Sequence, residues 1–258
     1  VVVPRDLKYD VRDGQWRPAD DVPPPQRRAP LSPEEVDELL DRGASLPEWH
    51  TPPAVAQELR RVRPPRDQRG LVVFLTGLSG SGKSTIARGL HDVLLEDGER
   101  SVTLLDGDVV RRMLSSELTF SREHRDLNIR RIGFVASEVA RHGGVALCCP
   151  IAPYAKTRAE IRDMVNAVGA DFVLVHVATP LEVCEQRDRK GLYAKARAGT
   201  IPAFTGVSDP YEEPTDADLV INTDLISVDD AVEAVLDYLA TGGWLELDGI
   251  MEESLTGA

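Results

Sequence analysis

A glycine-rich loop that follows an apolar run limits most strongly what this chain can fold into. The run is Leu71-Val72-Val73-Phe74-Leu75, and the loop reads Gly77-Leu78-Ser79-Gly80-Ser81-Gly82-Lys83-Ser84-Thr85. This spacing fits G-x-x-x-x-G-K-[ST], in which backbone N–H groups surround phosphate oxygens at the positive end of a helix. We predict that every loop residue except Leu78 contacts ATP, that Lys83 reaches the β- and γ-phosphates, and that Ser84 also holds Mg²⁺. The alternative is a glycine turn without a ligand.

Apolar runs of strand length alternate with helical patterns from Gly70 onward. This alternation is typical of an α/β fold in which helices flank a parallel sheet. The predicted strands are Leu71–Thr76, Val102–Leu105, Val145–Cys149, Phe172–Val177 and Leu219–Ile221. The predicted helices lie near Lys83–Leu95, Leu127–Arg141, Lys156–Val168, Leu181–Gln186 and Val228–Leu239. Ligands of such sheets bind beyond the carboxyl ends of the strands, where the motifs described below fall.

The charge of the chain is unevenly distributed. The formal net charge is −13, and residues 198–258 contain no Lys or Arg at all. An acidic segment of this kind argues against general nucleic-acid binding, because nucleic acids are themselves polyanions. The basic residues gather instead in the region of the phosphate loop, which favours small anionic substrates.

Hydropathy and cysteine content indicate the cellular compartment of the protein. Hydrophobic residues make up 42% of the chain, and no apolar run approaches the ~18–20 residues of a membrane helix. The first residues lack the pattern of a signal peptide. Cys148, Cys149 and Cys184 have neither disulfide nor metal-site spacing, so we interpret the adjacent pair as small core hydrophobes. These features predict a cytoplasmic protein that binds no membrane.

Two carboxylates follow the second predicted strand, in Asp106-Gly107-Asp108. Just beyond a strand end, both can face the phosphate loop. We predict that Asp106 binds Mg²⁺, directly or through water, and that Asp108 orients or deprotonates an acceptor hydroxyl. Lys83, Asp106 and Asp108 are therefore the candidate catalytic residues. A tight turn is the alternative, because the tripeptide alone is weak evidence.

Two basic segments complete the candidate site. Arg111 and the stretch 120–131 place several arginines near Phe120, which suits an anion that carries a flat ring. A solvated helix face is the alternative for some of the arginines in this stretch. Residues 184–197 are also rich in basic groups and precede the acidic segment. We interpret them as a lid that closes over the triphosphate, with Arg187 and Lys195 as further ATP-binding residues.

Residues 1–69 contain three proline clusters and cannot form one continuous helix or strand. Two short helices are predicted, one that begins after the N-cap Ser32 and stops at Gly43, and one from Pro53 to Arg61. The stretch LSPEEVDELLDRGASLPEWHTPPAVAQELRR resembles the C-terminal end of ATP sulfurylase, but the chain has none of that enzyme's catalytic motifs. Sulfurylase activity is therefore expected to be absent.

The predicted organisation has three parts: a sulfurylase-like fragment and linker over 1–64, a P-loop domain over 65–245, and an acidic tail over 246–258. The first residue is not methionine, so one interpretation is a piece of a longer fused protein that once carried a sulfurylase module. The other interpretation is an N-terminal extension without function.

Six motifs in order give a more specific resemblance. GLSGSGKST, DGDVVR, FSREHRDLNIRRIG, PIAPYAKTR, EQRDRKGLYAKARAG and IPAFTGVSDPYEEP are similar to adenylylsulfate (APS) kinase over about residues 71–222. The resemblance implies transfer of a phosphoryl group from ATP to the ribose 3′-hydroxyl of APS, which gives PAPS and ADP. It implies Mg²⁺ as cofactor, a homodimer as the assembly, and a role in sulfate assimilation.

The resemblance also carries roles onto matching positions of this sequence. It implies that APS is bound by Arg111, Phe120, Arg125, Asn128 and Phe204, with Ile151 and Lys190 in segments that line the same site. Phe120 and Phe204 are expected to close on the APS adenine from opposite sides.

Three departures from the family pattern stand out. Leu118-Thr119-Phe120-Ser121 replaces the usual LGFS, and Ala152 stands where the family usually has a serine, so no phosphoserine route passes through that position. Tyr154-Ala155 lacks a basic residue often found there, which is expected to weaken APS binding without abolishing it.

Two other functions are consistent with parts of the sequence. Some kinase-like domains fused to sulfurylases bind PAPS and regulate without catalysing, but such modules tend to lose the phosphate loop that is intact here. A small P-loop kinase for another metabolite would lack the paired aromatic residues.

Overall fold

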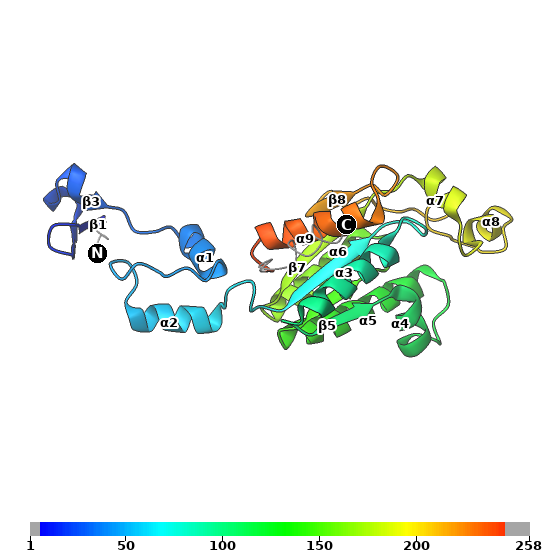
Figure 1. The fold of residues 1–258 in the computed structure, drawn as a ribbon, viewed down its shortest axis with the longest axis horizontal. Coiled ribbons are helices and arrows are strands. Elements are labelled where there is room, and N and C mark those ends of the chain that lie inside the picture. The colour runs from blue at the N-terminus through cyan, green and yellow to red at the C-terminus, as the bar shows by residue number, and fades with distance from the viewer. Residues whose placement is uncertain (1–5, 246–258) are drawn as a thin grey trace, which may run out of the picture. The chain divides into compact units, whose positions relative to one another are not determined.

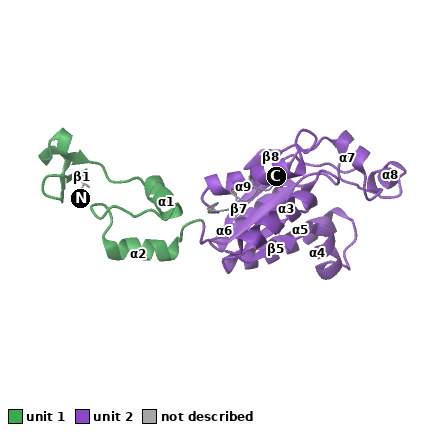
Figure 2. Cartoon of the chain, in the orientation of Figure 1, with its two compact units in different colours: residues 1–66 green, residues 67–258 purple. Residues whose placement is uncertain are grey.

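The computed structural model describes residues 6–245 (Figure 1). The chain divides into two compact units, residues 1–66 and residues 67–258 (Figure 2). The acidic tail expected over 246–258 lies outside the described residues.

The first unit contains a small antiparallel sheet that the sequence analysis missed. Its strands are β1 (Leu7–Asp10), β2 (Gln15–Pro18) and β3 (Arg27–Arg28), in the order β2-β1-β3. Single turns of 3₁₀ helix at Ala19–Asp21 and Pro24–Gln26 lie between β2 and β3 along the chain. The rings of Tyr9, Trp16 and Trp49 contact one another, with centroids 5.3–6.1 Å apart. Strands this short are stabilised by aromatic rings that lie far apart in the sequence. Such scattered residues produce no periodic pattern from which the strands could be predicted.

The two helices expected in this unit are present. They are α1 (Pro33–Asp41) and α2 (Pro53–Val62). Ser32 and Glu35 form a reciprocal capping box at the start of α1, and proline occupies the first position of both helices. These local signals explain why both helix starts could be read from the sequence.

The second unit is a five-stranded parallel sheet in the order β5-β6-β4-β7-β8, with helices on both faces (Figure 1). The strands are β4 (Leu71–Thr76), β5 (Val102–Leu105), β6 (Val145–Cys148), β7 (Asp171–Val177) and β8 (Leu219–Ile221). The helices are α3 (Lys83–Asp97), α4 (Gly107–Leu114), α5 (Arg122–Arg141), α6 (Ala155–Ala167), α7 (Leu181–Arg187), α8 (Leu192–Arg197) and α9 (Val228–Thr241). The predicted fold class is confirmed.

The central strand β4 supplies both halves of the core. Leu71, Val73 and Leu75 belong to one buried cluster with residues of α3 and α9, whereas Val72 and Phe74 belong to a second cluster with residues of α5 and α6. Alternate side chains of a strand point to opposite faces, and a strand covered on both faces reads as a continuous apolar run. Because β6 and β7 flank β4, the loop after β4 opens where the strand order reverses.

Two helices of this unit were not expected. Helix α4 begins at Gly107, with Asp106 as its N-cap, and α8 lies in the segment interpreted as a lid. Helix α5 begins at Arg122 and not near Leu127, because the Ser121 side chain accepts a hydrogen bond from the His124 N–H. The charged first turn of α5 hides this start from a search for apolar periodicity.

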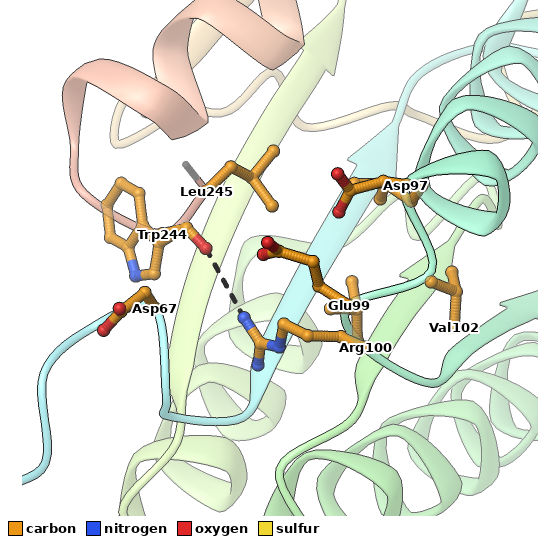
Figure 3. A pocket seen from close by; sticks show the side chains of 9 residues that line it. Asp67, Asp97, Glu99, Arg100, Val102, Trp244 and Leu245 are labelled. Carbon is orange, nitrogen blue, oxygen red and sulfur yellow. Dashed lines mark hydrogen bonds between the residues drawn. The ribbon is translucent and has the colours of Figure 1, made fainter. Parts of the chain in front are cut away.

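Hydrogen bonds and an ion pair at the amino edge of the sheet hold the segments around Arg69 and Trp244. Asp171, the first residue of β7, pairs with Arg69 and accepts a hydrogen bond from the Trp244 indole N–H at 2.8 Å. Arg100 donates to the carbonyl oxygens of Arg69, Gly143 and Trp244 in a small pocket that Val102 and Val145 also line (Figure 3). This pocket lies at the starts of β5 and β6, at the opposite edge from the phosphate loop.

Candidate functional site

The phosphate loop has the backbone shape that anion binding requires. Gly77, Gly80 and Gly82 have φ values of 150°, 80° and 105°, which side chains rarely tolerate, and Gly82 is the N-cap of α3. A Cβ atom at Gly77 would lie 2.5 Å from the Val177 carbonyl oxygen. The loop is therefore a concave set of backbone N–H groups at the positive end of a helix.

Lys83 is held inside this loop. Its side chain is buried, and its Nζ donates to the Leu78 carbonyl oxygen at 2.6 Å and to Ser81 Oγ at 3.3 Å. Burial lowers the pKa of Lys83 to about 8, because desolvation penalises the ammonium. An incoming phosphate oxygen would replace the two neutral acceptors and restore charge compensation.

Ser84 and Asp106 meet beside the loop, as the proposed metal site requires. Burial alone would raise the pKa of Asp106, but hydrogen bonds from the Asp108 N–H and the Ser84 hydroxyl lower it overall. A hydroxyl and a carboxylate are oxygen donors of the kind that Mg²⁺ accepts, so these residues fit the ion. The Cys149 thiol lies 3.7 Å from Ser84 Oγ and 3.7 Å from Asp106 Oδ2. The apolar residues around Cys149 in the sequence did not predict these contacts.

Asp108 lies in the first turn of α4 and forms an ion pair with Lys190, which comes from the segment between α7 and α8. Both side chains are more than half exposed. Exposed pairs of this kind contribute little stability, so a ligand can displace Lys190 at small cost. The structure thus brings together a candidate catalytic residue and a residue expected at the APS site.

Arg187 lies against the phosphate loop, whereas Lys195 is exposed on α8. The guanidinium of Arg187 donates to the Gly80 carbonyl oxygen at 3.4 Å and to both oxygens of Thr223 at 2.7 and 2.8 Å. Thr223 follows β8 and belongs to none of the motifs recognised in the sequence.

Tyr193 connects the lid segment to two parts of the site. Its hydroxyl donates to the Ser79 carbonyl oxygen at 2.9 Å, and its ring meets the Phe204 ring edge-on, with centroids 5.0 Å apart. Tyr193 is 3% exposed, and burial raises the pKa of its phenol. Sequence reasoning missed this residue, although it is the one aromatic among the basic groups of residues 184–197.

Arg111 and Phe120, two of the residues expected to bind APS, are brought together. The Arg111 guanidinium lies 4.5 Å from the centre of the Phe120 ring and donates to the carbonyl oxygens of Leu118 and Thr119. The Phe120 ring is 63% exposed. An exposed ring with a cation on one face leaves its other face free to stack on a planar group.

Arg125 ties the start of α5 to the loop that carries Phe204. It donates to the Ala203 carbonyl oxygen and to Thr205 Oγ1, both at 3.0 Å, and pairs with Asp209 at 2.9 Å. It also donates to the Tyr154 hydroxyl at 3.0 Å. In the described residues Phe120 and Phe204 make no ring contact with each other, so Arg125 is the link between the two segments.

Asn128 and Ile151 are less exposed than Phe120. Asn128 is 5% exposed, and its Oδ1 has no hydrogen-bond partner, which leaves a buried acceptor available to a ligand. The Ile151 carbonyl oxygen accepts from the Thr76 hydroxyl at 2.6 Å, which fixes the loop after β6 to the end of β4. The next residue, Ala152, has φ of 45° and is buried, so this loop is held in a conformation unusual for alanine.

Comparison with known proteins places the chain. The sequence profile described as "Adenylylsulphate kinase" matches residues 69–222, which is more than half of the chain. The chain belongs to the adenylylsulphate kinase family. Residues 69–222 form its adenylylsulfate kinase domain, with the ATP-binding loop of a P-loop kinase.

Two solved structures of this family resemble the chain. The hexameric APS kinase from Thiobacillus denitrificans is 42% identical with a TM-score of 0.73, and the match covers 95% of this chain and 44% of that one. The Mycobacterium tuberculosis APS kinase in complex with AMPPNP and APS is 45% identical with a TM-score of 0.64, over 67% of this chain and 98% of that one.

A curated relative extends the similarity into the first unit. The sulfate adenylyltransferase of Aspergillus fumigatus is 48% identical over 246 residues, which cover 95% of this chain and 43% of the relative. The similarity therefore includes most of residues 1–66, where the sulfurylase-like pattern was found. The chain spans less than half the length of the curated relatives it matches. Among the described residues, no helix has the length and hydropathy to span a bilayer.

Proposed function

We propose that the adenylylsulfate kinase domain of this chain transfers the γ-phosphoryl group of ATP to the ribose 3′-hydroxyl of APS, giving PAPS and ADP. The observation that carries the proposal is the meeting of two half-sites at one edge of the sheet. An intact phosphate loop surrounds Lys83, and Tyr193 joins this loop at Ser79 to the Phe204 ring. Arg125 in turn holds the loop that carries Phe204. The family match and the relative bound to AMPPNP and APS support it.

Each half-site has a separate role in this mechanism. Lys83 and the loop N–H groups bind the β- and γ-phosphates, and Ser84 and Asp106 would hold Mg²⁺, which neutralises phosphate charge when bound. Asp108 orients the 3′-hydroxyl and accepts its proton as the oxygen attacks phosphorus and the bond to ADP breaks. Ala152 offers no hydroxyl for a phosphoenzyme, so the transfer is direct.

The assignment can be tested by a direct assay. The purified chain is mixed with ATP, Mg²⁺ and APS, and PAPS and ADP are separated by chromatography. Stoichiometric formation of both products is expected. Folded protein that binds ADP but forms no PAPS would contradict the kinase proposal and favour a regulatory module that only binds nucleotide.

A Phe204→Ala variant is expected to raise the KM for APS by about 10- to 100-fold and to change the KM for ATP by less than about threefold. The reason is that stacking of a base on an aromatic ring contributes roughly 1–3 kcal/mol, and Phe204 is proposed to contact only APS. Steady-state kinetics with each substrate varied in turn measures the effect. Phe134→Ala, on an exposed part of α5, is the matched control and should leave both constants unchanged. An equal rise in both constants for Phe204→Ala would contradict the assignment.

The assembly and partners are also part of the proposal. We propose a homo-oligomer; the family resemblance implied a homodimer, whereas one relative is described as hexameric. We further propose that residues 1–66 associate with a sulfurylase module, because relatives that match this segment are sulfate adenylyltransferases. Sedimentation of the chain with and without residues 1–66 would test whether this unit contributes to assembly.

A further inference from the structure

Two loops converge on a single carbonyl oxygen of the phosphate loop. The Ser81 carbonyl oxygen accepts a hydrogen bond from the Thr179 hydroxyl at 3.0 Å and from the Thr223 hydroxyl at 2.9 Å. Thr179 follows β7 and Thr223 follows β8, and the two hydroxyl oxygens are 2.8 Å apart. The loop that binds phosphate is thus braced from the neighbouring strands and does not depend on its own glycines alone.

Thr223 holds Arg187 at the same time. Arg187 Nη1 donates to Thr223 Oγ1 at 2.7 Å, and Nη2 donates to the Thr223 carbonyl oxygen at 2.8 Å. A hydroxyl can donate once and accept twice, so Oγ1 can donate to Ser81 while it accepts from Arg187. The guanidinium donates two hydrogen bonds to this one residue, which sets its plane as well as its position.

The methyl group of Thr223 has a separate contact. A Cβ atom placed on Gly82 would lie 3.1 Å from Thr223 Cγ2, so the methyl covers the glycine that begins α3. The hydroxyl lies 3.4 Å from the same point, so both branches of the threonine pack against the start of the helix that follows the phosphate loop. β-Branched side chains have few χ1 rotamers, so this arrangement needs little further restraint.

We infer that Thr223 is a positioning residue for nucleotide binding, which sets the phosphate loop through Ser81 and orients Arg187 toward the bound nucleotide. The inference deepens the proposed function and rests on it only for the role of Arg187. The inference concerns the ATP half of the site and predicts no direct effect on APS binding.

Thr223→Val and Thr223→Ser separate the hydroxyl from the shape of the side chain. Valine keeps both branches but loses the hydrogen bonds, and the Kd for ADP and the KM for ATP are expected to rise about tenfold. Serine keeps the hydroxyl, and both constants are expected to stay within about threefold of the parent. The KM for APS should not change in either variant. Calorimetric titration with ADP measures binding in the absence of any reaction.

A double-mutant cycle tests whether Thr223 acts through Arg187. In an Arg187→Ala background, Thr223→Val should raise the Kd for ADP by only about two- to threefold, because the guanidinium that it orients is gone. A tenfold effect in both backgrounds would overturn the inference. So would an unchanged Kd for ADP in folded Thr223→Val, with folding checked by circular dichroism and thermal unfolding.

A second pair of variants tests the inference if Thr223→Val misfolds, and binding of ADP alone separates the inference from the kinase proposal. If Thr223→Val does not fold, Thr223→Ala is compared with Thr223→Ser, and equal Kd values for ADP in these two variants would overturn the inference. ADP binding is measured without APS. Failure to form PAPS would therefore contradict the kinase proposal and leave the inference about Thr223 standing on its binding data.

Discussion

A Lys83→Met variant is expected to lose about 10²- to 10³-fold in kcat while it remains folded. Methionine keeps the unbranched stem but removes the ammonium that neutralises charge on the transferring phosphoryl group. Desolvation lowers the pKa of Lys83 to about 8, which means that its charge is held at a cost to the folded state. The thermal midpoint of the variant is therefore expected to equal or exceed that of the parent, since the buried charge is removed.

Two measurements together check this prediction: kcat at saturating ATP and APS, and thermal unfolding of the free protein. Lys8→Ala, in the first unit, is the matched control and should change neither. A Lys83→Met variant with a kcat within tenfold of the parent would contradict the proposed role. Loss of activity accompanied by unfolding would show that the lysine is needed for the shape of the loop.

Asp106→Asn is expected to lower kcat by about 10²-fold at low Mg²⁺, with partial recovery as Mg²⁺ is raised. Asparagine preserves the N-cap of α4, because its side-chain oxygen can still accept the hydrogen bond from the Asp108 N–H, now 2.9 Å from Oδ1. The substitution therefore removes the negative charge that faces Ser84 without removing the cap.

The dependence of kcat on Mg²⁺ concentration measures this effect, and the rise in thermal midpoint on adding Mg²⁺ and ADP gives a readout without turnover. Asp92→Asn, exposed on α3, is the control. If Asp106→Asn kept the parent's dependence on Mg²⁺, the carboxylate would not belong to the metal site.

The core of the kinase unit could be predicted because its signals are local. All five strands of the sheet were located from apolar runs, since strands covered on both faces contain little else. The phosphate loop could be read because glycine, lysine and hydroxyl positions must follow one another in the chain. The helix starts at Pro33 and Pro53 were visible for the same reason.

The remaining features depend on partners far apart in sequence. Tyr193 reaches Ser79, Thr223 reaches Arg187 and Ser81, and Cys149 reaches Ser84 and Asp106. A single tyrosine, threonine or cysteine forms no sequence pattern from which such contacts could be predicted. Helices α4 and α8 were missed because they are short, with eight and six residues, so each contains too few turns for a helical period to stand out.

Asp171 contacts both Arg69 and Trp244, so residues near the two limits of the described part of the kinase unit lie close together at the start of β7. These contacts lie at the opposite edge of the sheet from the phosphate loop. Changes in the segments that flank Arg69 and Trp244 can therefore be accommodated without altering the residues around the nucleotide.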